Sequence, residues 1–487
     1  MPHAWKVRDP MTGTAAPVVQ QNRDIPEIVV RLRATFDSGV TRPAIWRRRQ
    51  LHALRRLLLD HTSDIEEALY DDLRKGRTES HLTEIGGVLA EVEDALRHLD
   101  RWMRSRRVAV PMNLKPATAR IHPEPLGVCL IIAPWNYPLT LTLNPLVGAL
   151  AAGNAAVVKP SELAPATSAL LADLLPRYLE AVAVVEGAVE ETTTLLAQRF
   201  DHIFYTGNGT VGRIVAAAAA KNLTPVTLEL GGKSPVFIDE TADMAVTARR
   251  LAWGKFTNAG QTCVAPDYVL VTQAARDSLI AALPRAIQHM FGNNPRTSAD
   301  YGRIVNDRHF RRLTGLMGEG DLLTGGVSDA GERYIAPTVL ADVPTGAAVM
   351  AEEIFGPILP ILTVRGVDDA IDFINARDKP LSLYAFTRDR TARQALLERT
   401  SSGGLVYNAP MIHLSVPNLP FGGVGESGMG AYHGKTSFDT FSHRKPVLSK
   451  PTRPDTLRLI YAPHTSRSFA FIAKAVARTH PLLGRKR

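Results

Sequence analysis

Apolar residues recur at helical spacing between residue 26 and about residue 104. The clearest runs are IWRRRQLHALRRLLLDH at 45–61 and EVEDALRHLDRWM at 91–103. An apolar residue that returns every three or four positions is the pattern of a helix with one buried face. The pattern predicts a helical layer and places Arg47, Arg48 and Arg49 on a solvated helix face rather than in a nucleic-acid site.

From residue 126 the pattern changes to short apolar runs separated by helical stretches. The runs are LGVCLIIAP (126–134), NAAVVKP (154–160), AVAVVEG (181–187), DHIFYTG (201–207) and PVTLELGG (225–232). Strands that alternate with helices are typical of a parallel sheet with crossover helices. A second set of such runs follows between residues 231 and about 405, so the chain is predicted to form two α/β domains.

Length and composition agree with this organisation. A chain of 487 residues suggests two or three domains, because single cores stop growing near about 250–300 residues. The start, MPHAWKVRDPMTG, lacks the apolar core of a secretory signal, and no run approaches the roughly 18 apolar residues of a spanning helix. We therefore expect a cytoplasmic protein.

The formal net charge of +9 would suit an anionic partner, but its position matters more than its sum. Residues 456–487 hold seven Lys and Arg residues and no Asp or Glu. The basic excess therefore belongs mainly to a C-terminal tail, and no nucleic-acid partner is predicted.

The chain has two cysteines, Cys129 and Cys263. They make no disulfide framework, and no histidine cluster at ligand spacing flanks either one, so no metal site is predicted. Cys129 lies in the apolar run LGVCLII and is predicted to be structural. Cys263 lies among polar, turn-forming residues in GQTCVAPDY (260–268), where disulfide partner, metal ligand, buried filler and nucleophile are all candidate roles.

A glycine motif complicates the second half of the first α/β region. Gly207, Gly209 and Gly212 in YTGNGTVGR spell G-x-G-x-x-G between a predicted strand and a helix, the pattern of a dinucleotide-binding turn. However, it follows the fourth strand rather than the first, and Glu229 sits in a glycine turn that would carry it away from a ribose. A nucleotide near this helix start is still expected, because glycine and a helix N-terminus favour phosphate.

Six motifs occur together in one order along the chain. They are PWNYP (134–138), KPSE (159–162), LELGGKSP (228–235), GQTCVAPDY (260–268), EEIFGP (352–357) and LPFGGVGESGMG (419–430). Their identity, order and spacing resemble the aldehyde dehydrogenase superfamily, and the stretch from residue 217 to 268 is similar to its class 3 branch. The resemblance covers about residues 30–445.

This resemblance implies two Rossmann-like parallel-sheet domains, one cofactor-binding and one catalytic, with a small bridging β element. The expected cofactor domain comprises residues 1–111, 126–229 and 405–430, and the expected catalytic domain residues 230–404. Residues 112–125 and 431–455 would form the bridging element, whose strand edges pair with a partner subunit in a homodimer. Residues 456–487 would be a basic amphipathic tail.

The resemblance assigns Cys263 as the nucleophile that attacks an aldehyde and forms a thiohemiacetal. Asn136 and the backbone N–H of Cys263 would stabilise the oxyanion, and Glu229 would activate the water that hydrolyses the resulting thioester. In isolation Asn136 could be a turn former and Glu229 a surface charge, but their order with Cys263 favours the catalytic roles.

For the cofactor, the resemblance places Lys159 and Glu162 at the adenosine ribose and Glu353 and Phe355 at the nicotinamide end. Trp135, Gly207 and Gly212 complete the expected site. A carboxylate such as Glu162 accepts hydrogen bonds from ribose hydroxyls but would repel a 2′-phosphate. We therefore expect NAD, with NADP as the alternative. Asn208 and Gly209 stand where the family usually has Ser and Thr, which puts the phosphate contacts in doubt.

The predicted reaction is oxidation of an aldehyde to the acid, on medium- or long-chain aliphatic or aromatic substrates. A coenzyme A-acylating enzyme is the alternative within the family, although Glu229 argues against it. A nucleic-acid-binding protein and a non-catalytic descendant are the alternatives outside it. The tail at 466–487 is predicted to make a peripheral membrane contact, because Phe469, Ile472, Ala473 and Val476 share one helix face while basic residues gather opposite.

Overall fold

The computed structural model describes residues 24–479, which form two compact units. The larger unit contains residues 24–102 and Pro125–His443, and the smaller contains Met103–Glu124 and residues 444–479. Residues 1–23, part of the expected cofactor domain, and the tail end at 480–487 lie outside the described residues.

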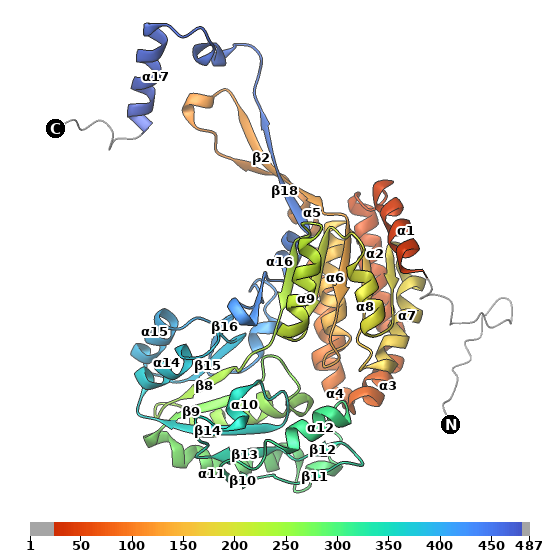
Figure 1. The fold of residues 1–487 in the computed structure, drawn as a ribbon, viewed down its shortest axis with the longest axis vertical. Coiled ribbons are helices and arrows are strands. Elements are labelled where there is room, and N and C mark those ends of the chain that lie inside the picture. Colours follow the sequence, from red (N-terminus) through yellow and green to blue (C-terminus); the bar gives the residue numbers. More distant parts are fainter. Residues whose placement is uncertain (1–23, 480–487) are drawn as a thin grey trace, which may run out of the picture. The chain divides into compact units, whose positions relative to one another are not determined.

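The larger unit begins with the predicted helical layer (Figure 1). Its elements are α1 (Ile25–Asp37), α2 (Ala44–Asp60), α3 (Thr62–Leu73), α4 (Arg77–Ser80), the π-helical turn η2 (His81–Ile85) and α5 (Gly86–Met103). The apolar residues of α2, including Leu51, Leu54 and Leu58, are fully buried, as their spacing predicts.

One part of the helical prediction was wrong. Arg47 does not lie on a solvated face of α2 but is buried. Its guanidinium donates hydrogen bonds to the carbonyl oxygens of Arg42 and Ala151. Ala151 lies in a helix 104 residues further along the chain. These two carbonyl oxygens satisfy N–H donors of the buried cation, and helical periodicity alone does not reveal such a distant contact.

A six-stranded sheet follows, in the order β17-β7-β6-β3-β4-β5, and it is parallel except for the short edge strand β17. Its strands are β3 (Val128–Ile132), β4 (Ala155–Lys159), β5 (Val182–Val184), β6 (His202–Thr206), β7 (Val226–Glu229) and β17 (Gly428–Met429). The connecting helices are α6 (Thr140–Ala152), α7 (Pro165–Tyr178), α8 (Val189–Leu196) and α9 (Gly209–Ala220), and α16 (Gly434–Thr440) packs on α6. Helices α1, α6 and α9 contact the sheet directly, so strands β3 to β6 are buried on both faces.

A seven-stranded sheet forms the rest of the larger unit, in the order β10-β13-β14-β9-β8-β15-β16, with only β10 antiparallel to its neighbour. Its strands are β8 (Pro235–Ile238), β9 (Tyr268–Thr272), β10 (Asp321–Thr324), β13 (Thr338–Ala341), β14 (Ile358–Val364), β15 (Ser382–Phe386) and β16 (Gly404–Tyr407). The sequence-based boundary at residue 405 thus falls within a strand of this sheet.

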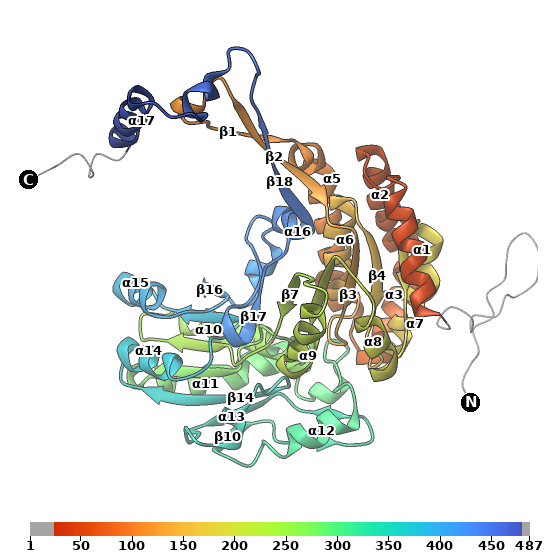
Figure 2. The ribbon, with the colours of Figure 1, turned by 45° about the horizontal axis from the view of Figure 1, so that its top comes forward.

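Helices and short turns surround the second sheet, and α11 and α14 pack on its strands (Figure 2). The helices are α10 (Met244–Phe256), α11 (Gln273–Phe291), α12 (Asp307–Thr314), α13 (Ala348–Ala351), α14 (Val367–Asn375) and α15 (Arg390–Arg399). The smaller elements are η4 (Thr257–Gly260), η5 (Pro295–Thr297), β11 (Ser328–Asp329), β12 (Tyr334–Ile335), η6 (Ile412–Ser415) and η7 (Gly425–Ser427). The predicted α/β class with two mostly parallel sheets is confirmed.

The smaller unit is built on a three-stranded sheet in the order β1-β2-β18. Its elements are β1 (Arg106–Val108), η3 (Met112–Leu114), β2 (Thr118–Pro125), β18 (Ser442–Ser449), η8 (Thr456–Ile460) and α17 (Ser466–Thr479). No helix among residues 24–479 is long and apolar enough to cross a membrane.

Candidate active site

A cavity of about 660 Å³ opens at the carboxyl ends of the parallel strands in the six-stranded sheet. The residues that line it follow β3, β4, β5, β6 and β7 in turn, and they meet residues from the second α/β region. The carboxyl edge of a parallel sheet is where ligands bind in folds of this type. The lining includes Trp135, Asn136, Lys159, Glu162, Gly207, Glu229, Cys263, Glu353 and Phe355.

The sequence-predicted site residues are thus brought together, with one exception. Gly212 is absent from the cavity lining and lies inside α9. A Cβ atom at this position would lie 2.9 Å from Leu230 Cδ2. Gly212 therefore allows close packing of α9 on the segment after β7, which is a role in helix packing rather than in ligand contact.

Cys263 lies in a tight loop directly after η4 and is half-buried. Asn258 and Ala259 adopt left-handed backbone conformations, and Gly260 follows with φ of 75°. A Cβ atom on Gly260 would lie 2.3 Å from the carbonyl oxygen of Gly356, so only glycine fits this close approach. The loop carries the thiol to the cavity instead of into an apolar core.

The Cys263 thiol donates a hydrogen bond to Glu229 Oε1 at 3.5 Å. Burial raises the pKa of this thiol well above its ordinary value, and the nearby carboxylates of Glu229 and Glu353 raise it further. The thiol is therefore protonated at neutral pH in this state of the protein, and the acceptor for its proton is already in contact with it.

Glu229 ends β7 and is almost fully buried. Its second oxygen, Oε2, accepts hydrogen bonds from the hydroxyls of Tyr432 at 2.8 Å and Thr206 at 3.2 Å. Burial raises the pKa of Glu229, while the hydrogen bonds from Tyr432, Cys263 and Thr206 oppose that rise. The two hydroxyls fix the carboxylate so that its other oxygen faces the cysteine.

Asn136 follows β3 and is 2% exposed. Its side-chain amide donates one hydrogen bond, from Nδ2 to the carbonyl oxygen of Gln261 at 3.1 Å. A primary amide has two N–H donors, so one anchors Asn136 to the cysteine loop and one is left for a ligand in the cavity.

The cavity lining includes Lys159, Glu162 and the start of α9, which are expected to hold a dinucleotide. Lys159 is buried and its ammonium lies 2.9 Å from the half-exposed carboxylate of Glu162. Asn208 caps α9 by accepting a hydrogen bond from the backbone N–H of Val211. The N-terminus of α9 is therefore still capped by a side chain, although the serine and threonine hydroxyls usual at this turn are missing. This N-terminus also lines the cavity.

Glu353 and Phe355, which follow α13, also line the cavity. Burial, followed by the charge of Asp267, raises the pKa of Glu353 to about 8, and its buried Oε1 has no hydrogen-bond partner among the described residues. The ring of Phe355 meets Trp135 edge-on at 5.3 Å. A buried carboxyl oxygen without a partner, in a cavity that is also lined by aromatic rings and by the glycine-rich start of α9, fits a dinucleotide with ribose hydroxyls and a planar ring.

Sequence reasoning missed Tyr432, Thr206 and the α12 residues Arg308, His309 and Arg312, which also line or support the cavity. Tyr432 reaches Glu229 because an isolated bridge pairs it with Phe421. No local pattern marks a tyrosine so far along the chain as a partner of Glu229. Among residues 24–479, no group of three or more His, Cys, Asp or Glu side chains is placed to hold a metal ion.

Comparisons with known proteins agree with this geometry. The model of the aldehyde dehydrogenase family matches residues 3–447. Aldehyde dehydrogenase family 3 member B1 of Rattus norvegicus is 52% identical over 449 residues, which cover 92% of this chain and 96% of the rat protein. The dimeric, NADP-preferring aldehyde dehydrogenase of Canis lupus familiaris is 48% identical over 446 residues, covering 91% and 98% of the two chains.

A solved structure, the substrate-bound state of Staphylococcus aureus AldH, superposes with a TM-score of 0.91 at 46% identity. The match covers 93% of this chain and 100% of the bacterial one. The family model and the relatives confirm the resemblance drawn from the six sequence motifs. The chain belongs to the aldehyde dehydrogenase family and is an NAD(P)-dependent oxidoreductase that acts on aldehydes.

Proposed function

We propose that this enzyme oxidises aldehydes to carboxylic acids through covalent catalysis at Cys263, with Glu229 as the base. The observation that carries the proposal is the contact between Cys263 Sγ and Glu229 Oε1 at 3.5 Å, inside a cavity that Asn136 also lines. Because the pKa of this thiol is raised, it needs a base in contact with it to act as a nucleophile, and Glu229 is in that position.

In the first step the thiol proton passes to Glu229 and the sulfur attacks the aldehyde carbon. A C–S bond forms, and the carbonyl electron pair moves onto oxygen. The free N–H of the Asn136 amide and the backbone N–H of Cys263 donate hydrogen bonds to that oxyanion. Bound NAD(P)⁺ would supply the hydride acceptor, and loss of a hydride from the aldehyde carbon would leave Cys263 as a thioester.

Between the two steps Glu229 releases the thiol proton to solvent. In the second step Glu229 removes a proton from water, and the resulting hydroxide attacks the thioester carbon. The C–S bond breaks, the acid is released, and the thiol of Cys263 is restored. Tyr432 and Thr206 hold the other oxygen of Glu229, so the carboxylate keeps one orientation for both proton transfers.

The test separates the two steps. Glu229→Gln is expected to slow steady turnover more than the first turnover, because the hydrolytic base is lost while hydride transfer persists in part. A pre-steady-state burst of NADH and an acyl adduct on Cys263 by intact mass are the expected results. Normal steady turnover without an adduct would remove Glu229 from the mechanism, and an acyl-thioester product on adding coenzyme A would favour the acylating reaction.

We propose NAD as the preferred cofactor. Support comes from Glu162, whose half-exposed carboxylate faces the cavity where a ribose would bind and would repel a 2′-phosphate. Lys159 lies beside it and partly offsets that repulsion, and the dog relative is named NADP-preferring. Comparison of kcat/KM for NAD and NADP in the wild type and in Glu162→Gln tests this. The variant should gain relative efficiency with NADP.

We propose medium- or long-chain aliphatic or aromatic aldehydes as substrates. The segment 408–418 supports this, because Ile412 and Val416 are exposed apolar side chains. The segment is tied to the cysteine loop through Tyr384, which accepts a hydrogen bond from Met411 N and donates one to the carbonyl oxygen of Val264. Rates of NADH production with aldehydes of graded length should rise with chain length, and equal kcat/KM from three to ten carbons would contradict the proposal.

We propose a homodimer built through the three-stranded sheet of the smaller unit. Strands β1 and β18 are its two edges, and the side chains of β1 are all exposed. Edge strands leave N–H and C=O groups that another strand can pair, and the dog relative is named dimeric. A monomer mass by light scattering at micromolar concentration would contradict the dimer.

We also propose that the tail makes a peripheral membrane contact. In α17, Phe469 and Val476 of the predicted apolar face are 71% and 49% exposed, and the basic side chains of Arg467 and Lys474 are exposed as well. Phe471, 56% exposed, is the exception, because it lies on the basic side of the helix. Leu482, Leu483 and the basic end at 485–487 lie outside the described residues. Salt-sensitive binding to anionic liposomes should disappear on truncation after Asp455 while activity on short aldehydes persists. Equal binding by both forms would contradict the contact.

A further inference from the structure

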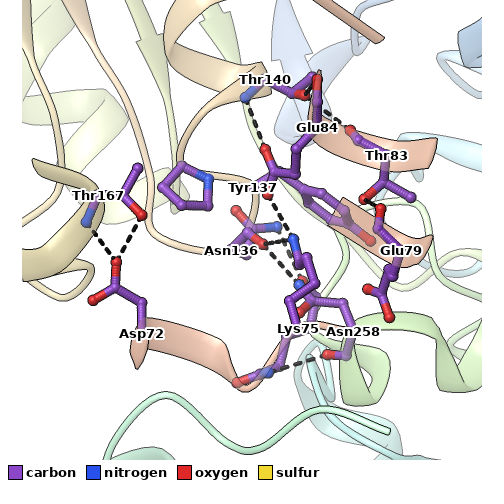
Figure 3. A network of polar contacts seen from close by, with 12 residues as sticks. Asp72, Lys75, Glu79, Thr83, Glu84, Asn136, Tyr137, Thr140, Thr167 and Asn258 are labelled. Atoms are coloured by element: carbon purple, nitrogen blue, oxygen red, sulfur yellow. Dashed lines mark hydrogen bonds and ion pairs between the residues drawn. The ribbon is translucent and has the colours of Figure 1, made fainter. Parts of the chain in front are cut away.

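A fully buried ion pair lies behind the candidate oxyanion residue (Figure 3). Lys75, in the connection between α3 and α4, places its ammonium 2.6 Å from Glu84 Oε1, and both side chains are 0% exposed. A buried pair is weak evidence for stability, because the desolvation of two charges can exceed their attraction. Stability alone therefore does not explain why Lys75 and Glu84 are buried at this position.

The pair holds the segment that carries Asn136 at both ends. The Lys75 ammonium donates a hydrogen bond to the backbone carbonyl oxygen of Asn136 at 3.3 Å and lies 4.1 Å from the ring centre of Tyr137. Glu84 Oε2 accepts a hydrogen bond from the backbone N–H of Thr140 at 2.8 Å, in the first turn of α6. One buried pair thus fixes both the start and the end of residues 136–140.

The same segment is tied to the cysteine loop from the other side. Asn258 Nδ2 donates to the carbonyl oxygen of Asn136 at 2.7 Å, and Tyr137 shares a 2.7 Å hydrogen bond with the hydroxyl of Thr262. The Asn136 carbonyl therefore receives two donors, one from Lys75 and one from Asn258. The Asn136 side chain also donates a hydrogen bond to the carbonyl oxygen of Gln261. Together these bonds fix the orientation of both the backbone peptide and the side-chain amide of Asn136.

The backbone of Lys75 is itself fixed. Arg74 adopts a left-handed conformation, and a Cβ atom on Gly76 would lie 2.6 Å from the carbonyl oxygen of Ala299. The carbonyl of Leu73 accepts a hydrogen bond from Arg303 N at 2.9 Å. The ammonium is thus delivered from a rigid connection rather than from a mobile surface chain.

Lys75 and Glu84 are not among the residues that line the cavity. Lys75 contacts the peptide of Asn136, which does line it, so the pair can affect a reaction through Asn136 without touching a ligand. Glu79 is a second buried carboxyl close to Lys75, and burial raises its pKa to about 7. Glu84 is the carboxylate that contacts the ammonium and balances its charge.

We propose that Lys75, paired with Glu84, is a positioning residue that fixes the Asn136 peptide and so aims the Asn136 amide at the substrate oxyanion. The proposal rests on the proposed function, in which Asn136 is an oxyanion donor. Preorganised donors contribute most when nothing has to move as charge develops, and a peptide held on its carbonyl side satisfies that condition.

The test is a double-mutant cycle of Lys75→Met and Asn136→Ala, measured as kcat/KM for hexanal with saturating NAD. In the wild-type background Lys75→Met should lower kcat/KM by roughly tenfold. This is less than the roughly hundredfold or more that removal of an oxyanion donor costs, because the Asn136 amide is misdirected but still present. In the Asn136→Ala background it should change kcat/KM by less than about twofold, because groups that act through one residue are not additive. The same loss in both backgrounds, or none in the first, would overturn the proposal.

Arg47→Met is the matched control. Arg47 is also a buried cation hydrogen-bonded to backbone carbonyls, but its acceptors belong to Arg42 and Ala151. It should lower Tm without lowering kcat/KM at a temperature where the protein is folded. An equal fall in kcat/KM for Arg47→Met and Lys75→Met would show a general structural effect and overturn the proposal.

If Lys75→Met does not fold, Lys75→Met/Glu84→Gln serves in the same cycle, because it removes the charge of the paired carboxylate together with that of the ammonium. Asn136→Ala alone separates the two proposals. If this variant keeps wild-type kcat/KM, Asn136 is not an oxyanion donor and the proposed function fails in that part. If it is slow and Lys75→Met is additive with it, only the positioning role fails.

Discussion

The two cysteines occupy regions that differ in one decisive respect. Burial raises the pKa of both thiols well above the ordinary value. Cys129 is 0% exposed in the middle of β3, between apolar neighbours on an inner strand. Cys263 is half-buried at a cavity, with a carboxylate oxygen 3.5 Å from its sulfur. The comparison shows that a perturbed thiol becomes a candidate nucleophile only where a proton acceptor and an open face accompany it.

The largest expected difference between the two regions is in turnover. Cys263→Ala should lower kcat by at least about a thousandfold, because removal of a nucleophile removes the covalent route. Cys129→Ala should leave kcat within about twofold, since β3 only supports the sheet. Steady-state NADH production by both variants measures this, and turnover in Cys263→Ala near the wild-type rate would break the comparison.

Removal of the acceptor should move two properties of Cys263 in opposite directions. The charge of Glu229 helps to raise the thiol pKa, so Glu229→Gln lowers it and increases the thiolate fraction at pH 8. Alkylation of Cys263 by iodoacetamide should become about threefold faster or more, while steady turnover falls by roughly a hundredfold.

The pH dependence of alkylation also distinguishes Cys263 from Cys129. In the wild type the raised pKa means that alkylation of Cys263 keeps accelerating above pH 9, where an ordinary thiol is already ionised. Peptide mapping should find no label on the fully buried Cys129 at any pH where the protein is folded. Slower alkylation in Glu229→Gln than in the wild type would contradict the electrostatic role of Glu229.

A smaller effect is expected from the hydroxyl behind Glu229. Tyr432→Phe removes a hydrogen bond that lowers the pKa of Glu229, so that pKa should rise and the acidic limb of kcat should move to higher pH. Loss of a bond to a charged group corresponds to about tenfold in kcat at neutral pH. Thr206→Val, which removes the longer 3.2 Å bond, is the matched control and should shift the limb less. An unmoved limb in Tyr432→Phe would contradict this role.

The smallest expected effect is on thermal stability, and here Cys129 should matter more than Cys263. Cys129→Ala leaves a gap in a closed core and should lower stability by about 1–2 kcal/mol, seen as a fall in Tm of about 1–4 °C. Cys263→Ala borders a cavity and should change Tm less. Scanning calorimetry of the two variants measures this, and a larger fall for Cys263→Ala would show that the cysteine loop carries more of the packing than its exposure indicates.

The outline of the fold could be predicted from local pattern. The apolar runs at 126–134, 154–160, 181–187, 201–207 and 225–232 all contain strands of one sheet, because strand and helix periods are properties of neighbouring residues. The burial of Arg47 and the location of β16 in the second sheet were not predictable in this way. Both depend on partners far along the chain.

The sequence by itself determined the family, the order of the motifs and the residue types of the site, because these depend on short contiguous motifs around Asn136, Glu229 and Cys263. Only the tertiary structure decided how those residues are held. Tyr432 and Thr206 orient Glu229, and Lys75 with Glu84 fixes the peptide of Asn136. Such contacts have no local signature, since hydrogen bonds and buried charges form between whichever side chains the packed elements bring within about 3 Å.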